Sequence, residues 1–219
     1  MAVRYADKEM LMQNRISRWP LLLALLLPSL QALQALPAHA LEPAASAASA
    51  QDRLGVAGPQ QVAGQVYRLA FVTPPSANGH VLQEYLPAGQ QLESYTEMLL
   101  LSHVPVQATP LQLAQHKYQE IQARRSGGDA LANGELLEGP DGSAVLDFVM
   151  SATLPDGRLV VEWNAYHYRQ QAAGITLTAL SRRAYGDEAA TTFLRGLKQR
   201  RLVDREAVLA WLPTVQRQG

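Results

Sequence analysis

The sequence contains no cysteine and no excess of charge of either sign. The missing cysteines exclude a disulfide framework, thiolate metal ligands, a thiol nucleophile and a lipid-modified cysteine anchor. The balance of 19 basic and 19 acidic residues excludes the strongly basic surface that nucleic-acid binding requires. We therefore expect no nucleic-acid partner.

The motifs of common catalytic and cofactor sites are also missing. There is no G-x-S-x-G nucleophile turn, no H-E-x-x-H zinc motif, and neither of the glycine-rich nucleotide motifs. The histidines beyond residue 40 are scattered rather than paired at ligand spacing: His80, His103, His116 and His167. We expect no metal and no cofactor, and we read His167 as a histidine at the edge of the core.

The sequence does contain enough hydrophobic residues to form a core. Hydrophobic residues make up 47% of the 219 positions, which is enough for one ordinary domain with additional segments.

The N-terminus has the pattern of a secretory signal. Arg15 and Arg18 precede an apolar run that starts at Leu21, and residues 38–40 read Ala-His-Ala. This order predicts a signal peptide over residues 1–40 that is cleaved after Ala40. An alternative start at Met12 would remove an unusually long leading extension.

An uncleaved anchor and a buried core helix are the alternative interpretations of this segment. Pro28, Gln31 and Gln34 interrupt the apolar run, which is then too short and too polar for the roughly 20 apolar residues of a membrane span. We expect an exported, periplasmic protein without a stable membrane anchor after cleavage. Without disulfides, such a domain depends on its hydrophobic core.

The rest of the chain divides by composition into a flexible leader (41–63), a single domain (64–213) and a tail (214–219). The leader is rich in alanine, serine, proline and glutamine and has no apolar period. Within the domain, a helix is predicted after Thr109-Pro110, and Asp204 is expected to cap a final short helix. Strands are predicted over 65–73, 81–86, 95–104, 144–155, 158–169 and 174–184.

This pattern predicts an α+β fold, in which an antiparallel β-sheet carries helices packed on it in the order βββ-α-βββ-α(α). The dipeptide Asp156-Gly157 predicts a two-residue hairpin turn, with Pro155 facing Arg158 and Met150 facing Trp163. That register gives the hairpin one apolar and one polar face.

The polar face is the first candidate site, for a ligand or a partner. Two carboxylates beside a tyrosine suit acid–base chemistry or the binding of a small polar ligand. A solvated face of an antiparallel sheet has the same composition, so a purely structural role stays open. The candidate residues are Asp147, Glu162, Asn164, Tyr166, Thr178 and Arg182.

A second candidate is the loop that carries Glu93, Tyr95 and Glu97, read either as turn chemistry or as a recognition loop. Residues 84–98 follow the pattern E-Y-x-P-x-G-x-x-L-x-x-Y-T-x-M, which resembles a motif of small, uncharacterised exported proteins of Gram-negative bacteria. The strand 162–169 is similar more loosely. The order of elements also resembles the fold of the photosystem II extrinsic protein P in topology only.

The resemblance implies no catalytic residue and favours a binding or assembly role. We therefore expect an exported, non-catalytic module whose partner is a periplasmic protein or a small polar ligand. A small hydrolase or isomerase that uses Asp147, Glu162 and Tyr166 is the alternative.

Overall fold

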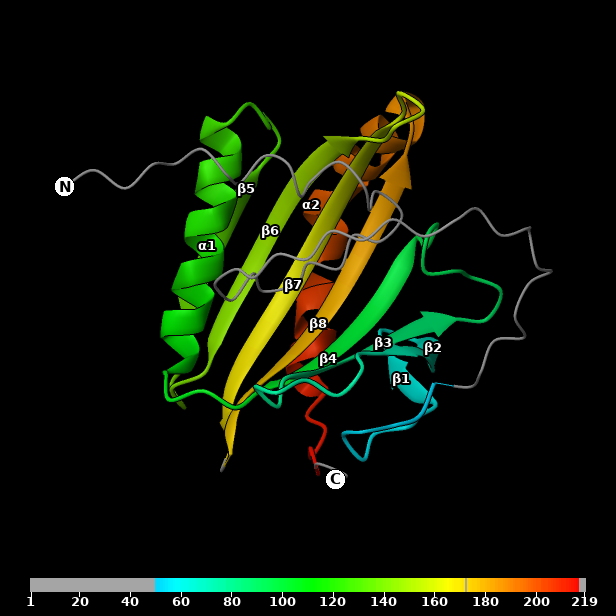
Figure 1. The fold of residues 1–219 in the computed structure, drawn as a ribbon. Helices are drawn as coiled ribbons and strands as arrows, with labels where there is room; N and C mark the ends of the chain where they lie inside the picture. The colour runs from blue at the N-terminus through cyan, green and yellow to red at the C-terminus, as the bar shows by residue number, and fades with distance from the viewer. Residues whose placement is uncertain (1–49, 172, 217–219) are drawn as a thin grey trace, which may run out of the picture.

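The computed structural model describes residues 50–171 and 173–216 (Figure 1). Within these residues, ten elements follow one another: β1 (Gln60–Val62), β2 (Gln65–Val72), β3 (Val81–Pro87), β4 (Glu97–Val104), α1 (Pro110–Ser126), β5 (Asn133–Glu138), β6 (Ala144–Thr153), β7 (Leu159–Gln171), β8 (Gly174–Tyr185) and α2 (Asp187–Ala210). The strands form one antiparallel sheet in the order β1-β2-β3-β4-β8-β7-β6-β5.

The predicted α+β class is confirmed, but the predicted order lacks two strands. Both missing strands, β1 and β5, lie at the edges of the sheet. Edge strands are commonly short and polar, so their hydrophobic pattern is weak. β1 has three residues, and β5 reads NGELLE, with two glutamates among six residues.

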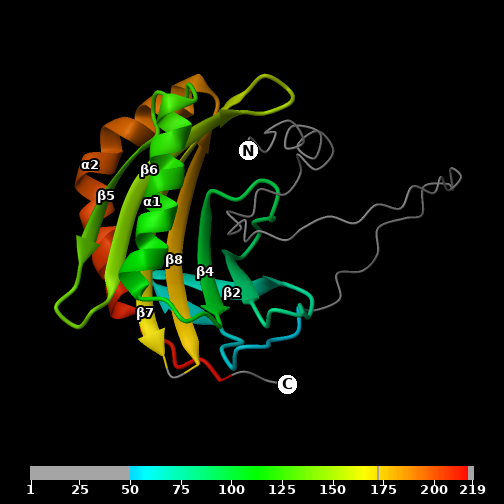
Figure 2. The same ribbon diagram turned by 60° about the vertical axis from the view of Figure 1, so that its left-hand side comes forward.

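The sheet lies between the two helices. α1 runs along one face over β5, β6 and β7, and α2 crosses the other face behind β7 and β8 (Figures 1 and 2). We name these surfaces the α1 face and the α2 face. The core on the α1 face includes Phe148, Tyr166 and Ile121, and that on the α2 face includes Trp163 and Val208.

α1 begins as the sequence predicts. The side chain of Thr109 accepts a hydrogen bond from the Gln112 N–H, and the Gln112 side chain accepts one from the Thr109 N–H, which completes a capping box. Pro110 occupies the first turn, where its missing N–H costs nothing. Arg124 and Arg125 lie in the last turn, near the negative end of the helix dipole.

The C-terminal region corrects the prediction of a final short helix. α2 continues without a break from Asp187 to Ala210, and Asp204 lies inside it rather than at a cap. Its carboxylate faces the sheet and is 3% exposed. Asp204 is therefore part of the interface between α2 and the sheet.

The hairpin between β6 and β7 has a different register from the predicted one. The Leu154 N–H bonds to the Arg158 carbonyl and the Gly157 N–H to the Leu154 carbonyl, so the loop contains three residues. Gly157 has φ +84°, the left-handed conformation that closes such a loop. Met150 consequently faces Glu162 instead of Trp163. A shift of one residue moves the side chains of one strand to the opposite face relative to the other strand.

The predicted leader of 41–63 overlaps the folded unit. Leu54, Val56 and Val62 are buried in the core of the α2 face, although they show no regular spacing in the sequence. Val215 packs against the same core, and the Gln216 N–H bonds to the Leu54 carbonyl. The folded unit thus begins before Gly64 and includes part of the predicted tail. The predicted signal peptide lies outside the described residues.

Candidate functional site

The sheet separates the predicted site residues into two groups. Glu162, Asn164 and Tyr166 point to the α1 face, whereas the remaining three point to the α2 face: Asp147, Thr178 and Arg182. The prediction that all six share one surface is wrong. The longer turn places Asp147 on the face opposite Glu162, and the pairing of β7 with β8 places Thr178 and Arg182 there too. All six are at most 3% exposed, so neither group forms a wet sheet face.

On the α2 face, Arg182 joins the sheet to α2. Its guanidinium donates to both carboxylate oxygens of Asp204, at 2.6 and 2.8 Å, and also contacts Glu97 on β4. The Tyr67 hydroxyl donates to Glu97 at 3.1 Å, and Arg200 pairs with Glu97 and Asp204. Arg182 and Glu97 therefore have a structural role: their contacts attach α2 to the sheet.

Asp147 forms a second attachment of α2. It accepts a hydrogen bond of 2.7 Å from the indole of Trp163 and pairs with Arg201 at 3.1 Å and Arg205 at 3.7 Å. Burial raises the pKa of Asp147 above its usual value, and the indole and the two arginines offset only part of that effect. Asp147 cannot cooperate with Glu162, because the sheet lies between them. The alternative catalytic pair is therefore not assembled.

On the α1 face, Glu162 is the centre of a hydrogen-bonded cluster. Its carboxylate accepts bonds from the Tyr95 hydroxyl at 2.8 Å and the Asn164 amide at 3.0 Å, and it contacts the Arg183 guanidinium. Asn164 in turn accepts a bond from the Ser181 hydroxyl. Burial and register place these groups together, since β7 and β8 pair Glu162 with Arg183 and Asn164 with Ser181.

Arg183 and Tyr95 also contact each other directly. The guanidinium carbon lies 4.0 Å from the centre of the Tyr95 ring, a cation–π geometry. Burial raises the pKa of Tyr95 well above its usual value, and the neighbouring Glu162 carboxylate raises it further. Burial opposes the charge of Arg183, but Glu162 and Tyr95 outweigh it, and the pKa of Arg183 is raised.

The three residues of the predicted recognition loop have three different environments. Tyr95 is buried in the Glu162 cluster, and Glu97 is bound to Arg182 on the other face. Glu93 is exposed. The backbone N–H groups of Thr96 and Glu97 bond to the Gln90 side chain, which fixes the turn. Much of this segment therefore has a structural role, and Glu93 is the residue of the three whose carboxylate is exposed to solvent.

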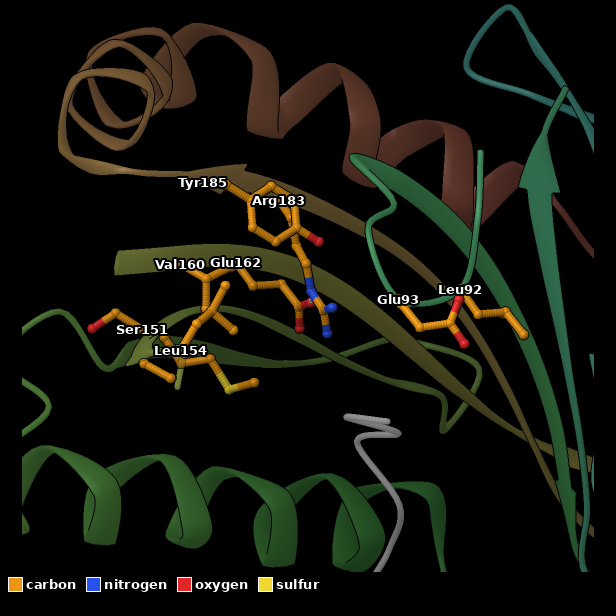
Figure 3. A pocket seen from close by; sticks show the side chains of 10 residues that line it. Leu92, Glu93, Ser151, Leu154, Val160, Glu162, Arg183 and Tyr185 are labelled. Carbon is orange, nitrogen blue, oxygen red and sulfur yellow. Dashed lines mark hydrogen bonds and ion pairs between the residues drawn. The ribbon is translucent and has the colours of Figure 1, made fainter. Parts of the chain in front are cut away.

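A pocket opens beside the Glu162 cluster, between the 90–94 loop and the end of the β6–β7 hairpin (Figure 3). In Figure 3 the side chains of Glu162 and Arg183 meet on one side, and Leu92 and Glu93 lie across from them on the loop. The space open to water molecules is about 40 Å³, room for about two or three waters. The other lining residues are Met150, Ser151, Ala152, Leu154, Val160 and Tyr185.

The chemistry of this pocket favours binding. Glu162 already accepts from two donors and pairs with Arg183, and Tyr95 stays protonated because its pKa is raised, so neither offers a ready general base. The hydroxyl of Tyr166 is buried without a hydrogen-bond partner among the described residues, and burial raises the pKa of Tyr166 as well. In residues 50–171 and 173–216, no group of three or more histidine, aspartate or glutamate side chains is arranged to hold a metal ion.

Sequence reasoning missed Arg183 and Tyr185. The alternation in β8 directed attention to Arg182, which has the opposite orientation. The signal was present in the dipeptide Arg182-Arg183, because neighbouring residues of a strand point to opposite faces and one of the two had to join the Glu162 side. The ion pair across β7 and β8 then follows from the pairing register.

The fold and the pocket define an α+β protein with one antiparallel sheet between two helices and a small, partly apolar pocket at one end of the α1 face. A protein-family model matches residues 54–210, and the chain belongs to that family, which is uncharacterised. No curated protein and no solved structure matches the chain. None of the described helices is long and apolar enough to cross a membrane.

Proposed function

We propose that the protein is exported to the periplasm and acts there as a non-catalytic binding module. Its contact site is the pocket beside Glu162 and Arg183. The partner inserts the end of one side chain into this pocket. That side chain has an aliphatic stem and a terminal positive charge.

The order of basic residues, apolar run and Ala-His-Ala supports export. The test is N-terminal sequencing of the protein from a periplasmic fraction. We expect a chain that starts at Leu41. A chain that starts at Met1 or Met12, or that stays in the cytoplasm, would contradict the export proposal.

The observation that favours binding over catalysis is that the Glu162 carboxylate is already engaged by three donors. Its three donors come from Tyr95, Asn164 and Arg183, and the ion pair is internally neutral. A buried ion pair of this kind keeps one side of the pocket rigid, because removing either member would leave an uncompensated buried charge. The cluster therefore shapes the pocket.

The partner's chemistry follows from the rest of the lining. Leu92, Leu154 and Val160 provide aliphatic contact. Because the charges of Glu162 and Arg183 cancel each other, the exposed carboxylate of Glu93 leaves the pocket with a net negative charge. A lysine side chain matches both features, since its methylene stem packs on apolar surface while its ammonium stays at the edge. The small volume excludes a whole cofactor.

The binding test compares two charge-removing variants in co-purification from periplasmic extract. Glu93→Gln removes the carboxylate beside the pocket, and Glu138→Gln removes an exposed carboxylate on the edge strand β5. We expect a partner that is retained by the wild type and by Glu138→Gln but is reduced about tenfold with Glu93→Gln. Equal recovery with both variants, or no partner at all, would contradict the proposed site.

A further inference from the structure

Polar side chains of β7 and β8 form a compact block on the α2 face, away from the pocket, and His103 on β4 lies beside the block, paired with Thr176. The register of β7 and β8 pairs His167 with Thr178 and Arg169 with Thr176. Directly paired side chains of an antiparallel sheet share a face, with their Cβ atoms about 5 Å apart. His167 and Arg169 are also two residues apart on one strand, so all four side chains point in the same direction.

Each of these side chains has a buried polar atom without a hydrogen-bond partner in the described part of the chain. These atoms are Thr176 Oγ1, Thr178 Oγ1, His167 Nδ1 and Arg169 Nε. Both threonines are 0% exposed, and His167 is 5% exposed. Buried polar atoms are almost always paired with protein, water or a ligand, so four unpaired atoms in one block indicate a missing partner.

The block carries the positive charge of Arg169, and no carboxylate of the described residues is in direct contact with that charge. Arg169 forms no ion pair with a described residue, and the hydrogen bond that its guanidinium donates to the Pro213 carbonyl is long, at 3.4 Å. The Asp141 carboxylate, exposed on the turn between β5 and β6, acts on the Arg169 charge without contacting it. A half-buried guanidinium without a counterion is costly and favours an anion beside it.

The donors of the block match an oxyanion. A guanidinium and two threonine hydroxyls donate hydrogen bonds, and a neutral imidazole donates through one nitrogen. Arginine does not ligate metal ions, and no carboxylate takes part in the block, so the block does not suit a cation.

We propose that Arg169, His167, Thr176 and Thr178 form a binding site for a small oxyanion, a phosphate or sulfate group. The site is independent of the pocket on the α1 face, because the sheet separates the two. The group is either a free ion or the phosphate of a lipid headgroup, and the experiment distinguishes these two sources.

The first arm is calorimetric titration of the purified protein with inorganic phosphate and with sulfate, in chloride buffer at constant ionic strength. We expect saturable binding by the wild type. The double variant Thr176→Val with Thr178→Val keeps the shape of the block and removes both hydroxyl donors, so it weakens the affinity by at least about tenfold. Thr192→Val, at an exposed position of α2, is the control and binds as the wild type does.

The second arm measures binding to vesicles of phosphatidylglycerol and of phosphatidylcholine. A vesicle interaction that the double threonine variant loses, with no response to free phosphate, assigns the site to a headgroup. If the double variant does not fold, Arg169→Gln takes its place, with the exposed Arg195→Gln as its control. Equal responses of wild type and variants in both arms, or a crystal grown in phosphate with water alone at the four side chains, would overturn the proposal.

Discussion

Arg182 on β8 and Asp204 on α2 form a two-pronged ion pair across the interface between the sheet and the helix. The arginine Nε and Nη2 atoms donate to the two carboxylate oxygens at 2.6 and 2.8 Å, and both residues are 3% exposed. Fork-to-fork geometry of this kind is strong and fixes orientation. The pair therefore sets the position of α2 along the sheet.

Replacing Asp204 by alanine should lower the free energy of unfolding by about 3–5 kcal/mol, because Arg182 keeps a buried charge with less compensation. Urea denaturation measures this change. Glu206→Ala, an exposed position on the same helix, should stay within about 0.5 kcal/mol of the wild type. Arg182→Met combined with Asp204→Leu should recover much of the loss; a double variant as unstable as Asp204→Ala would show that the charge is not its cause.

Two glycine-to-alanine substitutions, one in the hairpin loop and one in α2, should change the stability in opposite directions. Gly157 has φ +84°, so Gly157→Ala should cost about 1–2 kcal/mol of stability. Gly196 lies inside α2 with nothing within 4 Å of an added methyl group, so Gly196→Ala should stabilise the protein by about 0.5–1 kcal/mol. Thermal melting of both variants checks the signs, and a Gly157→Ala variant as stable as the wild type would contradict the left-handed conformation of Gly157.

The two buried tyrosines near Glu162 should respond differently to loss of the hydroxyl. Tyr95→Phe removes a donor to a buried carboxylate and should cost about 1.5–3 kcal/mol. Tyr166→Phe removes a hydroxyl that has no partner among the described residues, and should be neutral or stabilising. Chemical denaturation of the pair decides between these expectations. A larger loss for Tyr166→Phe would show that its hydroxyl has an important partner.

Stability should depend on pH through His167. Burial lowers the pKa of His167 from 6.5 to about 4, and the charge of Arg169 contributes, while Asp141 opposes the shift. The unfolded chain then binds a proton more readily, so stability falls as the pH drops from 6.5 to about 4, by at most about 3 kcal/mol.

His167→Gln should reduce this slope but not abolish it, because burial also lowers the pKa of His80. His116→Gln, at an exposed helix position, should leave the slope unchanged. Denaturation across this pH range, in a chloride buffer free of phosphate, sulfate and carboxylate ions, makes the comparison. The same slope in His167→Gln and the wild type would place the titration elsewhere.

The fold class was predictable because its main elements have strong local signals. Thr109, Pro110 and the terminal arginines define α1, and alternating residues define the central strands. The edge strands β1 and β5 were missed because their residues are half solvated and few. The burial of Leu54 depends on residues far along the chain, including Gln216, and no local pattern encodes it.

The candidate site was predictable in its residues but not in its arrangement. Glu162, Asn164 and Tyr95 do meet, and Asp147 does not join them, because one extra loop residue at Leu154–Arg158 changes the register of the hairpin. Asp-Gly occurs in both two-residue and three-residue loops, so the dipeptide alone does not fix the register. The packing of α2 on the sheet also depends on tertiary contacts. It buries a sheet face that the sequence predicts to be solvent-exposed.

The central claim is that the protein binds its partner through the pocket beside Glu93. A photo-crosslinking amino acid placed at position 93, in the protein expressed in its own cells, tests it directly, with position 138 as the matched exposed control. The account predicts one discrete adduct from position 93, recovered in the periplasmic fraction, and none from position 138. No adduct from either position, or the same adducts from both, would contradict it.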